Sequence, residues 1–199
     1  METIGLILSA GQSSRMQEHK ALLPWFECTL IEWEIVQMKK AGIQHIFVVL
    51  GYESEKIFPI IKNYNIHTII NKTWWKGRTN SIVTGLTNIK STLINETNYN
   101  LLIQNVDQPI KSNDLKILIE ASRNSIFDII QPTYNKELCH PLIINKDHFN
   151  NLLNIEKNKT TLRDFTKNYQ IKKIKINAQY LQYNLNTPDE YKKALENFK

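Results

Sequence analysis

The sequence predicts an α/β protein, a three-layer αβα sandwich around a mostly parallel sheet, and three observations support this fold class. Short apolar runs typical of strands alternate with longer segments whose apolar positions recur at helical spacing. Most of these runs are apolar throughout, as in strands that are buried on both faces of a parallel sheet. No Pro- or Gly-rich linker, internal repeat or charge block divides the 199 residues. We therefore expect a single domain over residues 1–199.

The first half of the chain alternates strictly between strand and helix. The segment 4–8 is a continuous apolar run closed by Ser9-Ala10-Gly11, which predicts a buried strand. The segment 29–40 has apolar residues at helical spacing, and Ala41-Gly42 supplies a C-terminal stop. The elements predicted in this half are strands at residues 4–8, 46–50 and 66–70 and helices at residues 29–40, 54–63 and 79–89.

The second half continues the alternation and ends in a helix. Ile171, Ile174 and Ile176 indicate a strand with one polar face, at or near an edge of the sheet. Pro188 suits a first helical turn and opens a last helix over residues 189–197. Between them and the first half, we expect strands at residues 100–104, 128–131 and 141–144 and helices at residues 113–123, 146–153 and 160–169.

Composition excludes several classes of protein. The apolar stretches are far shorter than the roughly 20 residues of a membrane-spanning helix, and the N-terminus lacks the pattern of a secretory leader, so we expect a cytoplasmic protein without membrane contact. The formal net charge of +6 favours anionic partners. The lysines are scattered, with no basic run, which favours small phosphorylated ligands over nucleic acid. Cys28 and Cys139 lack the spacing of a disulfide framework or zinc site.

The segment directly after the first predicted strand carries the strongest functional signal. It reads Leu8-Ser9-Ala10-Gly11-Gln12-Ser13-Ser14-Arg15-Met16, followed by Lys20-Ala21-Leu22-Leu23-Pro24. It contains neither a Walker A sequence nor the glycines of a dinucleotide-binding loop. It does place a glycine that allows unusual backbone angles, hydroxyl groups and the two cations Arg15 and Lys20 at the end of a strand. These groups suit a nucleoside triphosphate.

This segment resembles the signature of nucleotidyltransferases with a MobA-like fold, in which Leu-x-Ala-Gly-x-Ser-x-Arg-Met leads to Lys-x-Leu-Leu-Pro. The resemblance extends from Ile4 to Tyr191 and is strongest to the branch of molybdenum cofactor cytidylyltransferases. It implies a Rossmann-like sheet of the nucleotide-diphospho-sugar transferase type. It also implies a Mg²⁺-dependent reaction in which a phosphorylated acceptor attacks the α-phosphorus of an NTP and pyrophosphate leaves.

Three further motifs extend the resemblance. The block from Asn71 to Leu86, with Gly77 and Ser81, resembles the segment that this branch places beside the base, while Trp74 and Trp75 are better explained by packing. Val106-Asp107-Gln108-Pro109 resembles the Gly-Asp-Gln-Pro motif, with Val106 in place of glycine. Tyr183-Asn184-Leu185-Asn186-Thr187-Pro188 resembles the closing motif, in which Asn186 either binds metal through its carbonyl oxygen or helps to cap the last helix.

The resemblance implies a role for each matched residue. The His140 of Cys139-His140-Pro141 falls on the acceptor side, where a general base and a neutral packing residue are both open, and the other histidines are expected at the surface. Asn184 and Asn186 also fall on the acceptor side. The implied catalytic residues are Arg15, Lys20 and Asp107; the nucleotide-binding residues are Leu8, Ser9, Ala10, Gly11, Ser13, Lys20, Gly77, Asn80 and Ser81; and the implied Mg²⁺ ligands are Asp107 and Asn186.

The nucleotide and the acceptor remain open to alternatives. Leu8-Ser9-Ala10-Gly11, together with the Ser81 block and Gln108-Pro109, favours CTP over GTP. The acceptor implied by the closest branch is molybdopterin, with transient contact to molybdoenzyme maturation proteins. Related enzymes instead use sugar, alditol or choline phosphates. A nucleotide- or pterin-binding chaperone without catalysis is a different class of function, and the complete set of Arg15, Lys20 and Asp107 argues against it.

Overall fold

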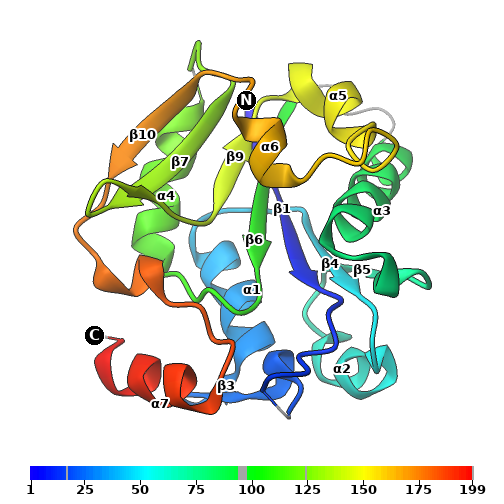
Figure 1. The fold of residues 1–199 in the computed structure, drawn as a ribbon, viewed down its shortest axis with the longest axis vertical. Helices are drawn as coiled ribbons and strands as arrows, with labels where there is room; N and C mark the ends of the chain where they lie inside the picture. The colour runs from blue at the N-terminus through cyan, green and yellow to red at the C-terminus, as the bar shows by residue number, and fades with distance from the viewer. Residues whose placement is uncertain (17, 94–97, 124, 199) are drawn as a thin grey trace.

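The computed structural model describes residues 1–16, 18–93, 98–123 and 125–198 and shows one large sheet between two layers of helices (Figure 1). Its strand order is β10-β7-β9-β6-β1-β4-β5, with β8 paired to β7 outside this path. Neighbours run parallel except at β9, which is antiparallel to both β6 and β7. The strands are β1 (Glu2–Ser9), β4 (Ile46–Leu50), β5 (His67–Ile70), β6 (Tyr99–Asn105), β7 (Ile129–Tyr134), β8 (Glu137–Leu138), β9 (Leu142–Ile144) and β10 (Ile171–Lys175).

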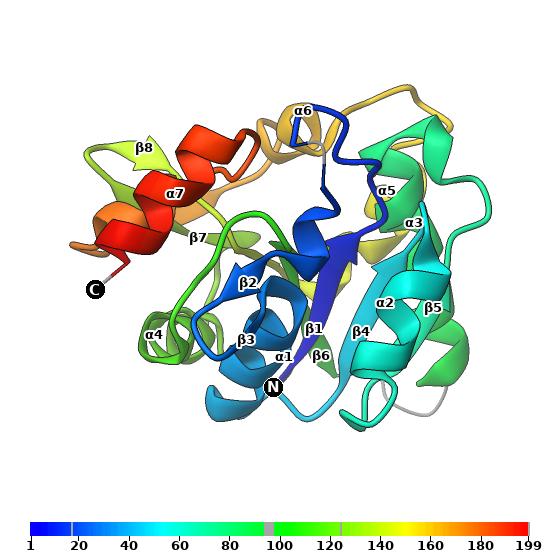
Figure 2. The ribbon, with the colours of Figure 1, turned by 90° about the horizontal axis from the view of Figure 1, so that it is seen from below.

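The helices divide between the two faces of the sheet. Apolar residues of α1, α2, α4 and α7 pack on one face, and those of α3, α5 and α6 pack on the other (Figure 2). Each face therefore has its own apolar core. The helices are α1 (Leu30–Lys40), α2 (Ser54–Ile61), α3 (Arg78–Thr92), α4 (Ser112–Ser122), α5 (Phe149–Leu153), α6 (Leu162–Thr166) and α7 (Pro188–Asn197).

The first strand shows why these apolar runs form central strands. Ile4 and Leu6 of β1 belong to the core under α3, whereas Ile7 belongs to the core under α1, because successive side chains of a strand point to opposite faces. All three side chains are fully buried. Burying such a side chain stabilises a fold by roughly 1.5–3 kcal/mol. A polar residue at any of these positions would be buried in one of the two cores.

The start of α1 is fixed by a capping box. The Thr29 side chain accepts a hydrogen bond from the Glu32 backbone amide, and the Glu32 carboxylate accepts one from the Thr29 amide. Such reciprocal bonds satisfy two amide groups that a helix start leaves unpaired. Before α1, the short strands β2 (Pro24–Trp25) and β3 (Cys28–Thr29) form a hairpin. Together they return the chain from the loop after β1 to the face of the sheet.

The register of the central strands brings three strand ends together. Ser9 of β1 lies opposite Leu50 of β4, and Leu8 lies opposite Asn105 of β6. The chain proceeds from β1 to β4 and β5 on one side, and then crosses to β6 on the other side of β1. Loops that leave adjacent strands in opposite directions open a crevice at the carboxyl edge of a parallel sheet. Because β9 is antiparallel, its first residues also lie at this edge.

The predicted fold class is confirmed, and most element bounds differ by only a few residues from those predicted. The helices expected at residues 146–153 and 160–169 are shorter. The first divides into a 3₁₀ turn, Lys146–His148, and α5, and the second is α6 alone. The β2–β3 hairpin and β8 were not predicted, because two-residue strands leave no periodic pattern. Within the described ranges, the structure contains no helix with both the length and the apolarity needed to cross a membrane.

Candidate active site

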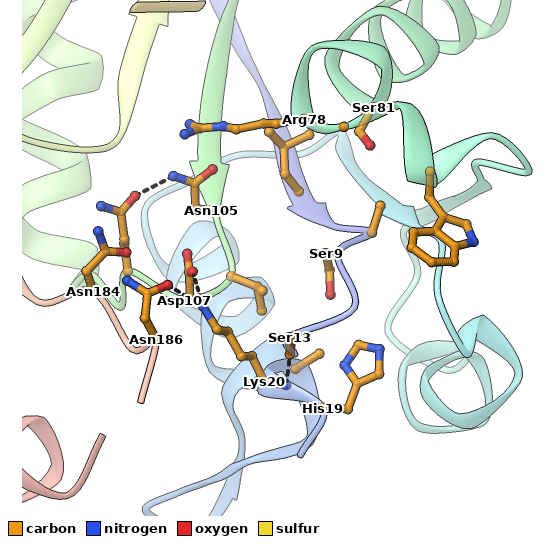
Figure 3. A pocket seen from close by; sticks show the side chains of 18 of the residues that line it. Ser9, Ser13, His19, Lys20, Arg78, Ser81, Asn105, Asp107, Asn184 and Asn186 are labelled. Atoms are coloured by element: carbon orange, nitrogen blue, oxygen red, sulfur yellow. Dashed lines mark hydrogen bonds and ion pairs between the residues drawn. The ribbon is translucent and has the colours of Figure 1, made fainter. Parts of the chain in front are cut away.

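A cavity of about 430 Å³ lies at the carboxyl edge of the sheet. Its walls come from the loop after β1, the start of α3, the turn after β6 and the segment before α7 (Figure 3). The volume falls in the range of roughly 300–1,000 Å³ that is usual for small-molecule sites. The topology thus places a cavity where the strand order predicts one.

Most of the residues implied by the motifs meet in this cavity, although they come from four distant segments. The lining includes Leu8, Ser9, Ala10, Gly11, Ser13, Arg15, Lys20, Gly77, Ser81, Asp107, Asn184 and Asn186. Two implied residues are absent from this lining. Asn80 lies within the start of α3, and His140 lines a neighbouring cavity.

The loop after β1 keeps an open path to the cavity at Gly11. A Cβ atom at this position would meet no other atom within 4 Å, so a ligand can approach the backbone closely. The unusual backbone angles expected at Gly11 occur instead at Ser13, whose φ is 56°. The Ser13 hydroxyl accepts a hydrogen bond of 3.3 Å from the Lys20 amide, which closes the loop on itself. Behind the loop, a Cβ on Gly51 would lie 2.6 Å from the Ala10 carbonyl oxygen.

Lys20 joins three segments of the chain at one point. Its Nζ donates hydrogen bonds of 2.7 Å to Asp107 Oδ2 and 2.7 Å to Asn186 Oδ1 (Figure 3). The Lys20 and Asp107 side chains are 12% and 21% exposed. This partial exclusion of water strengthens the ion pair relative to one on an open surface. The cluster fixes the Lys20 ammonium on the floor of the cavity.

The turn after β6 holds Asp107 through backbone contacts. The Val106 amide donates to the Leu8 carbonyl at 3.1 Å, and the Leu185 amide donates to the Asp107 carbonyl at 2.9 Å. Val106, which replaces the glycine of the family motif, is 7% exposed and packs in the core under α1. The valine is therefore accommodated by this core, and Asp107 still reaches the cavity.

A fully buried acid, Glu34 of α1, lies beneath this turn. The Gln104 side-chain amide donates a 3.2 Å hydrogen bond to Glu34 Oε2 and a second one to the Gln108 carbonyl. Burial raises the pKa of Glu34 well above its usual value, while the hydrogen bonds from Gln104 and the Ile110 backbone act in the opposite direction. The buried site thus favours the neutral acid. Glu34 and Gln104 together link α1 to both ends of the Asp107 turn.

The opposite wall is formed where α3 begins. Gly77 caps the helix with φ 97°, a conformation that other residues rarely adopt. Ser81 lines the cavity, and its hydroxyl oxygen accepts a 3.1 Å hydrogen bond from the Asn71 side chain. Trp74 also lines the cavity, whereas Trp75 is largely exposed. Of these residues, Gly77 and Ser81 are the ones that the resemblance places beside a nucleotide base.

Asn80 has a supporting position within this wall. Its Oδ1 accepts hydrogen bonds of 2.9 Å from Asn71 and 3.0 Å from Thr73, and its Nδ2 donates one of 2.9 Å to Glu156. These bonds engage both ends of the side-chain amide. The network fixes the turn before Gly77 and leaves Asn80 outside the cavity lining, while its contact with a nucleotide stays a prediction.

Arg78 and His140 form a pair at the boundary of the cavity. Arg78 Nη2 lies 3.2 Å from His140 Nε2. Burial, followed by the charge of Arg78, lowers the pKa of His140 to about 3. Because an efficient general base has a pKa near the working pH, this position favours a neutral His140 that accepts a hydrogen bond from Arg78.

The segment before α7 combines the two roles considered for Asn186. Thr187 caps the helix by accepting a 3.3 Å hydrogen bond from the Glu190 amide, and Pro188 is the first residue of α7. The Asn186 backbone amide donates to Glu190 Oε2 at 3.1 Å. Its side chain is thereby left free to contact Lys20. The cap therefore positions the Asn186 oxygen in the cavity.

The Asp107 and Asn186 oxygens fit a hard cation. Both lie 2.7 Å from the same positively charged nitrogen, so two oxygen ligands already converge on a single point. Carboxylate and amide oxygens suit Mg²⁺, which usually takes its other ligands from phosphate and water. In the part of the chain that the structure describes, no three His, Cys, Asp or Glu residues form a metal cluster. A metal here would accordingly depend on oxygens from a bound nucleotide.

Several cavity residues were not identified from the sequence. They include His19, Arg78 and Asn105. His19 was expected at the surface, but its Nε2 lies 2.9 Å from the Tyr52 carbonyl oxygen beside the loop after β1. Arg78 lies within the recognised block from Asn71 to Leu86, and Asn105 directly precedes the Val106-Asp107 motif, so these positions were the available signal. Their orientation toward the cavity depends on how α3 and β6 pack.

Comparisons with known proteins show the family of this chain. Residues 5–174 match the family model described as MobA-like NTP transferase domain. The chain is 30% identical over 135 residues to a probable molybdenum cofactor guanylyltransferase of Bacillus mycoides, covering 66% of this chain and 62% of that protein, less than two thirds of its length. It is 25% identical over 197 residues to the molybdenum cofactor cytidylyltransferase of Escherichia coli, covering 97% and 95% of the two chains.

Solved structures share the fold at low sequence identity. The Rv0371c protein of Mycobacterium tuberculosis has a TM-score of 0.81 to this structure at 18% identity, with 98% of each chain covered. A crystal structure of the same protein in complex with manganese has a TM-score of 0.76 at 17% identity, covering 98% of this chain and 99% of that one. At such identities these likenesses describe the fold alone.

Proposed function

Because this chain belongs to the MobA-like NTP transferase family, we propose that it transfers a nucleoside monophosphate, CMP from CTP, to a phosphorylated acceptor and releases pyrophosphate. The proposed acceptor is molybdopterin, the organic part of the molybdenum cofactor. One observation carries the proposal: Lys20 meets Asp107 and Asn186 on the floor of the cavity, beside the loop that resembles a triphosphate site.

The transfer step requires positioning and charge neutralisation. An oxygen of the acceptor phosphate forms a bond to the α-phosphorus of the NTP, the bond from that phosphorus to the bridging oxygen breaks, and pyrophosphate leaves. Phosphoryl-type transfers of this kind depend mainly on orientation and electrostatic stabilisation. Arg15 and Lys20 supply positive charge along the proposed path of the triphosphate. A phosphate monoester is ionised at neutral pH, so no residue has to remove a proton from it.

Asp107 and Asn186 are the proposed ligands of Mg²⁺. When bound, the metal supplies positive charge against the triphosphate. Lys20 donates to both oxygens in the structure. Binding of Mg²⁺ with the nucleotide therefore implies that the ammonium turns from these oxygens toward a phosphate group, where it neutralises negative charge. The manganese complex of the Rv0371c protein supports a divalent metal within this fold.

The choice of CTP and of molybdopterin has two supports. The relative from Escherichia coli, a cytidylyltransferase for the molybdenum cofactor, aligns over 97% of this chain. The loop reads Leu8-Ser9-Ala10-Gly11, which resembles the pattern that accompanies cytosine, and Ser81 provides a hydroxyl in the cavity. The guanylyltransferase relative makes GTP the main competing nucleotide. The proposal places the reaction in the cytoplasm, where nucleoside triphosphates are made.

The test is pyrophosphate release with Mg²⁺ and each of CTP, GTP, UTP and ATP. Each nucleotide is supplied with molybdenum-loaded molybdopterin and, separately, with a panel of sugar, alditol and choline phosphates. Turnover with CTP and the pterin is the expected result. Turnover only with GTP would replace CTP as the proposed nucleotide. Turnover only with a sugar, alditol or choline phosphate would replace molybdopterin as the proposed acceptor. Nucleotide binding without pyrophosphate release from any pair would contradict transfer and support a nucleotide-binding chaperone.

A further inference from the structure

A second cavity of about 560 Å³ adjoins the first and shares Arg78 with it. It lies between the β7–β8 turn, α6 and β10. Figure 3 shows the Arg78 side chain extending from the start of α3 along the wall opposite Lys20, with its guanidinium group above Asn105. Arg78 therefore lines both cavities.

The lining of the second cavity is strongly basic. Arg78, Lys136, Arg163 and Lys173 contribute four cations from four different elements, against the single carboxylate of Glu137. None of the four forms an ion pair with a carboxylate among the residues that the structure describes. Unpaired cations around a concave surface produce a positive field that attracts anionic ligands.

Two polar side chains also line this cavity. Gln131 is 8% exposed, and its Nε2 donates to the Cys139 carbonyl at 3.0 Å. His140 Nε2 lies 3.2 Å from Arg78 Nη2. Lys173 lies opposite Gln131 in the pairing of β10 with β7, so both side chains face the same side of the sheet. A ligand in this cavity would therefore meet Lys173 beside Gln131 on the same wall.

The remaining lining is Thr166 and three leucines. Leu142 and Leu162 are buried, whereas Leu138 of β8 is 43% exposed. A ligand with a flat or apolar body would cover Leu138 and remove this surface from water. The cavity therefore combines an apolar floor with cations around it.

We propose that Arg78 binds the phosphate of the acceptor, and that the acceptor's body, which carries a second anionic group, occupies the cavity between Gln131, Arg163 and Lys173. The phosphate lies at the junction of the two cavities, next to the proposed site of the nucleotide. Lys136, Arg163 and Lys173 select acceptors with this additional negative charge over neutral ones. The inference rests on the proposed function, because the bound anion is an acceptor only if the transfer reaction takes place. The binding of the anion can be measured without turnover.

The experiment uses two probes that differ in one carboxylate, phenyl phosphate and 4-carboxyphenyl phosphate. Their affinities are measured by isothermal titration calorimetry with Mg²⁺ and a non-hydrolysable CTP analogue present, so that the first cavity is filled. We expect the wild-type protein to bind 4-carboxyphenyl phosphate at least about 10-fold more tightly. Arg78→Gln should weaken binding of both probes by about 10-fold or more, because a charged partner of the shared phosphate is lost.

A second comparison separates the two roles. The double variant Arg163→Gln/Lys173→Gln should lose the preference for the carboxylate and keep the affinity for phenyl phosphate within about twofold. Lys175→Gln, on the same strand but outside the cavity lining, is the matched control for a general change of charge. The double variant and Lys175→Gln should bind the CTP analogue like the wild type, because neither changes a residue that lines the first cavity. All variants should keep the melting temperature of the wild type.

Three results would overturn the proposal: unchanged binding of both probes by Arg78→Gln, equal binding of the two probes by the wild type, or an equal loss in Lys175→Gln. Failure of the transfer reaction gives a different result. A protein that binds both probes as expected but releases no pyrophosphate with any acceptor would retain this anion site and lose the proposed function. If the protein releases pyrophosphate but the Arg78→Gln variant binds both probes like the wild type, the proposed function stands and Arg78 has no role in acceptor binding.

Discussion

The two walls of the cavity use positive charge in opposite ways. On the floor, the Lys20 ammonium is already bound by Asp107 and Asn186. On the opposite wall, Arg78 has only the ring nitrogen of His140 as a polar partner among the described residues. Burial in this hollow lowers the pKa of Arg78, and Asp107 partly offsets the effect. One cation is held in place by neighbours, and the other is exposed to incoming ligands.

The comparison teaches how each wall would respond to a substrate. The Lys20 ammonium has three N–H donors, two of which are used by Asp107 and Asn186, so one is left for a phosphate. A metal that took over the two oxygens would release the other donors, which would couple nucleotide binding to metal binding. An unpaired guanidinium binds an anion directly and in a fixed, forked geometry. The floor is therefore suited to a reactive triphosphate, and the opposite wall to recognition of a second anion. The predictions below test this division.

The largest expected effect on the rate comes from removing Lys20 or Asp107 from the floor of the cavity. Lys20→Ala and Asp107→Ala should each lower kcat/KM for pyrophosphate release by about 100- to 1,000-fold, because each removes charge that acts in the transition state. Their combination should cost little more than either alone. The free energy of unfolding should change by less than about 1 kcal/mol, since both groups lie on loops and are partly exposed. Steady-state assays and urea titration measure both quantities.

The matched control for these variants is Lys116→Ala, an exposed lysine on α4. It removes the same charge at a distance from the cavity and should keep the wild-type rate. A wild-type rate in Lys20→Ala would contradict the catalytic part of the proposal.

The next effect is on stability and concerns Glu34, which lies beneath the turn that carries Asp107. Glu34→Ala should lower the free energy of unfolding by about 2–4 kcal/mol, because it leaves a cavity and removes the partner of the Gln104 side chain. Glu34→Gln keeps the volume and one hydrogen-bond-accepting oxygen, and it should be far less destabilising near pH 7. Chemical denaturation of both variants gives the comparison.

Glu34 also predicts a pH dependence of stability. Its folded-state pKa lies above the unfolded value, so the folded state binds the proton more tightly. This contribution is full below the unfolded pKa and is lost as pH rises through the folded pKa. Glu34→Gln should remove that loss. Identical pH profiles of unfolding for Glu34→Gln and wild type would contradict a buried neutral acid.

A smaller effect is expected at Asn186, the uncharged member of the floor. Asn186→Ala should raise the Mg²⁺ concentration for half-maximal activity by about 5- to 10-fold, roughly the loss of one oxygen ligand at 1–1.4 kcal/mol. Asn177→Ala, which is exposed and outside the cavity lining, is the control. An unchanged metal requirement would restrict Asn186 to holding Lys20 and capping α7.

The smallest effect on rate is expected at His140. His140→Gln should reduce kcat by less than about 5-fold and leave the pH–rate profile between pH 6 and 8 unchanged, because a group with a pKa of about 3 does not titrate there. Loss of a general base would cost about 100-fold or more. If His140→Gln abolished a pH-dependent step in kcat that the wild type shows between pH 6 and 8, His140 would act as a general base after all.

His140 should still affect stability in acid. Its folded pKa is lowered, so its contribution is present above the unfolded value near 6.5 and is lost as pH falls toward 3. Denaturation of His140→Gln between pH 4 and 7 should show a shallower decline than the wild type.

The sequence predicted the floor better than the opposite wall for physical reasons. Gly11, Ser13 and Lys20 lie in one continuous motif whose backbone forms the loop, so their proximity follows from local order. The approach of Asp107 to Lys20 follows from adjacent parallel strands. These residues were found because the fold class brings the ends of such strands together.

The opposite wall depends on packing that a single sequence does not reveal. Whether Arg78 or Asn80 faces the cavity is decided by the rotation of α3 on the sheet, which places Arg78 in the cavity lining and Asn80 outside it. The pairing of Lys173 with Gln131 depends on the register between β7 and β10, whose paired residues are 42 positions apart in the chain. The direction of β9 was equally invisible, since parallel and antiparallel central strands have the same apolar pattern.

The reversed direction of β9 has a consequence for how this fold can change. β9 pairs with β6 and β7, so both ends of the connection between β7 and β9 are anchored in the sheet. Among the described strands, β8 within that connection pairs only with β7. The connection can therefore lengthen or be exchanged without disturbing the central register, at a cost of only about 0.6 kcal/mol for each doubling of its length. This same stretch borders the basic cavity, so its replacement would reshape that cavity and leave the floor of the first cavity unchanged.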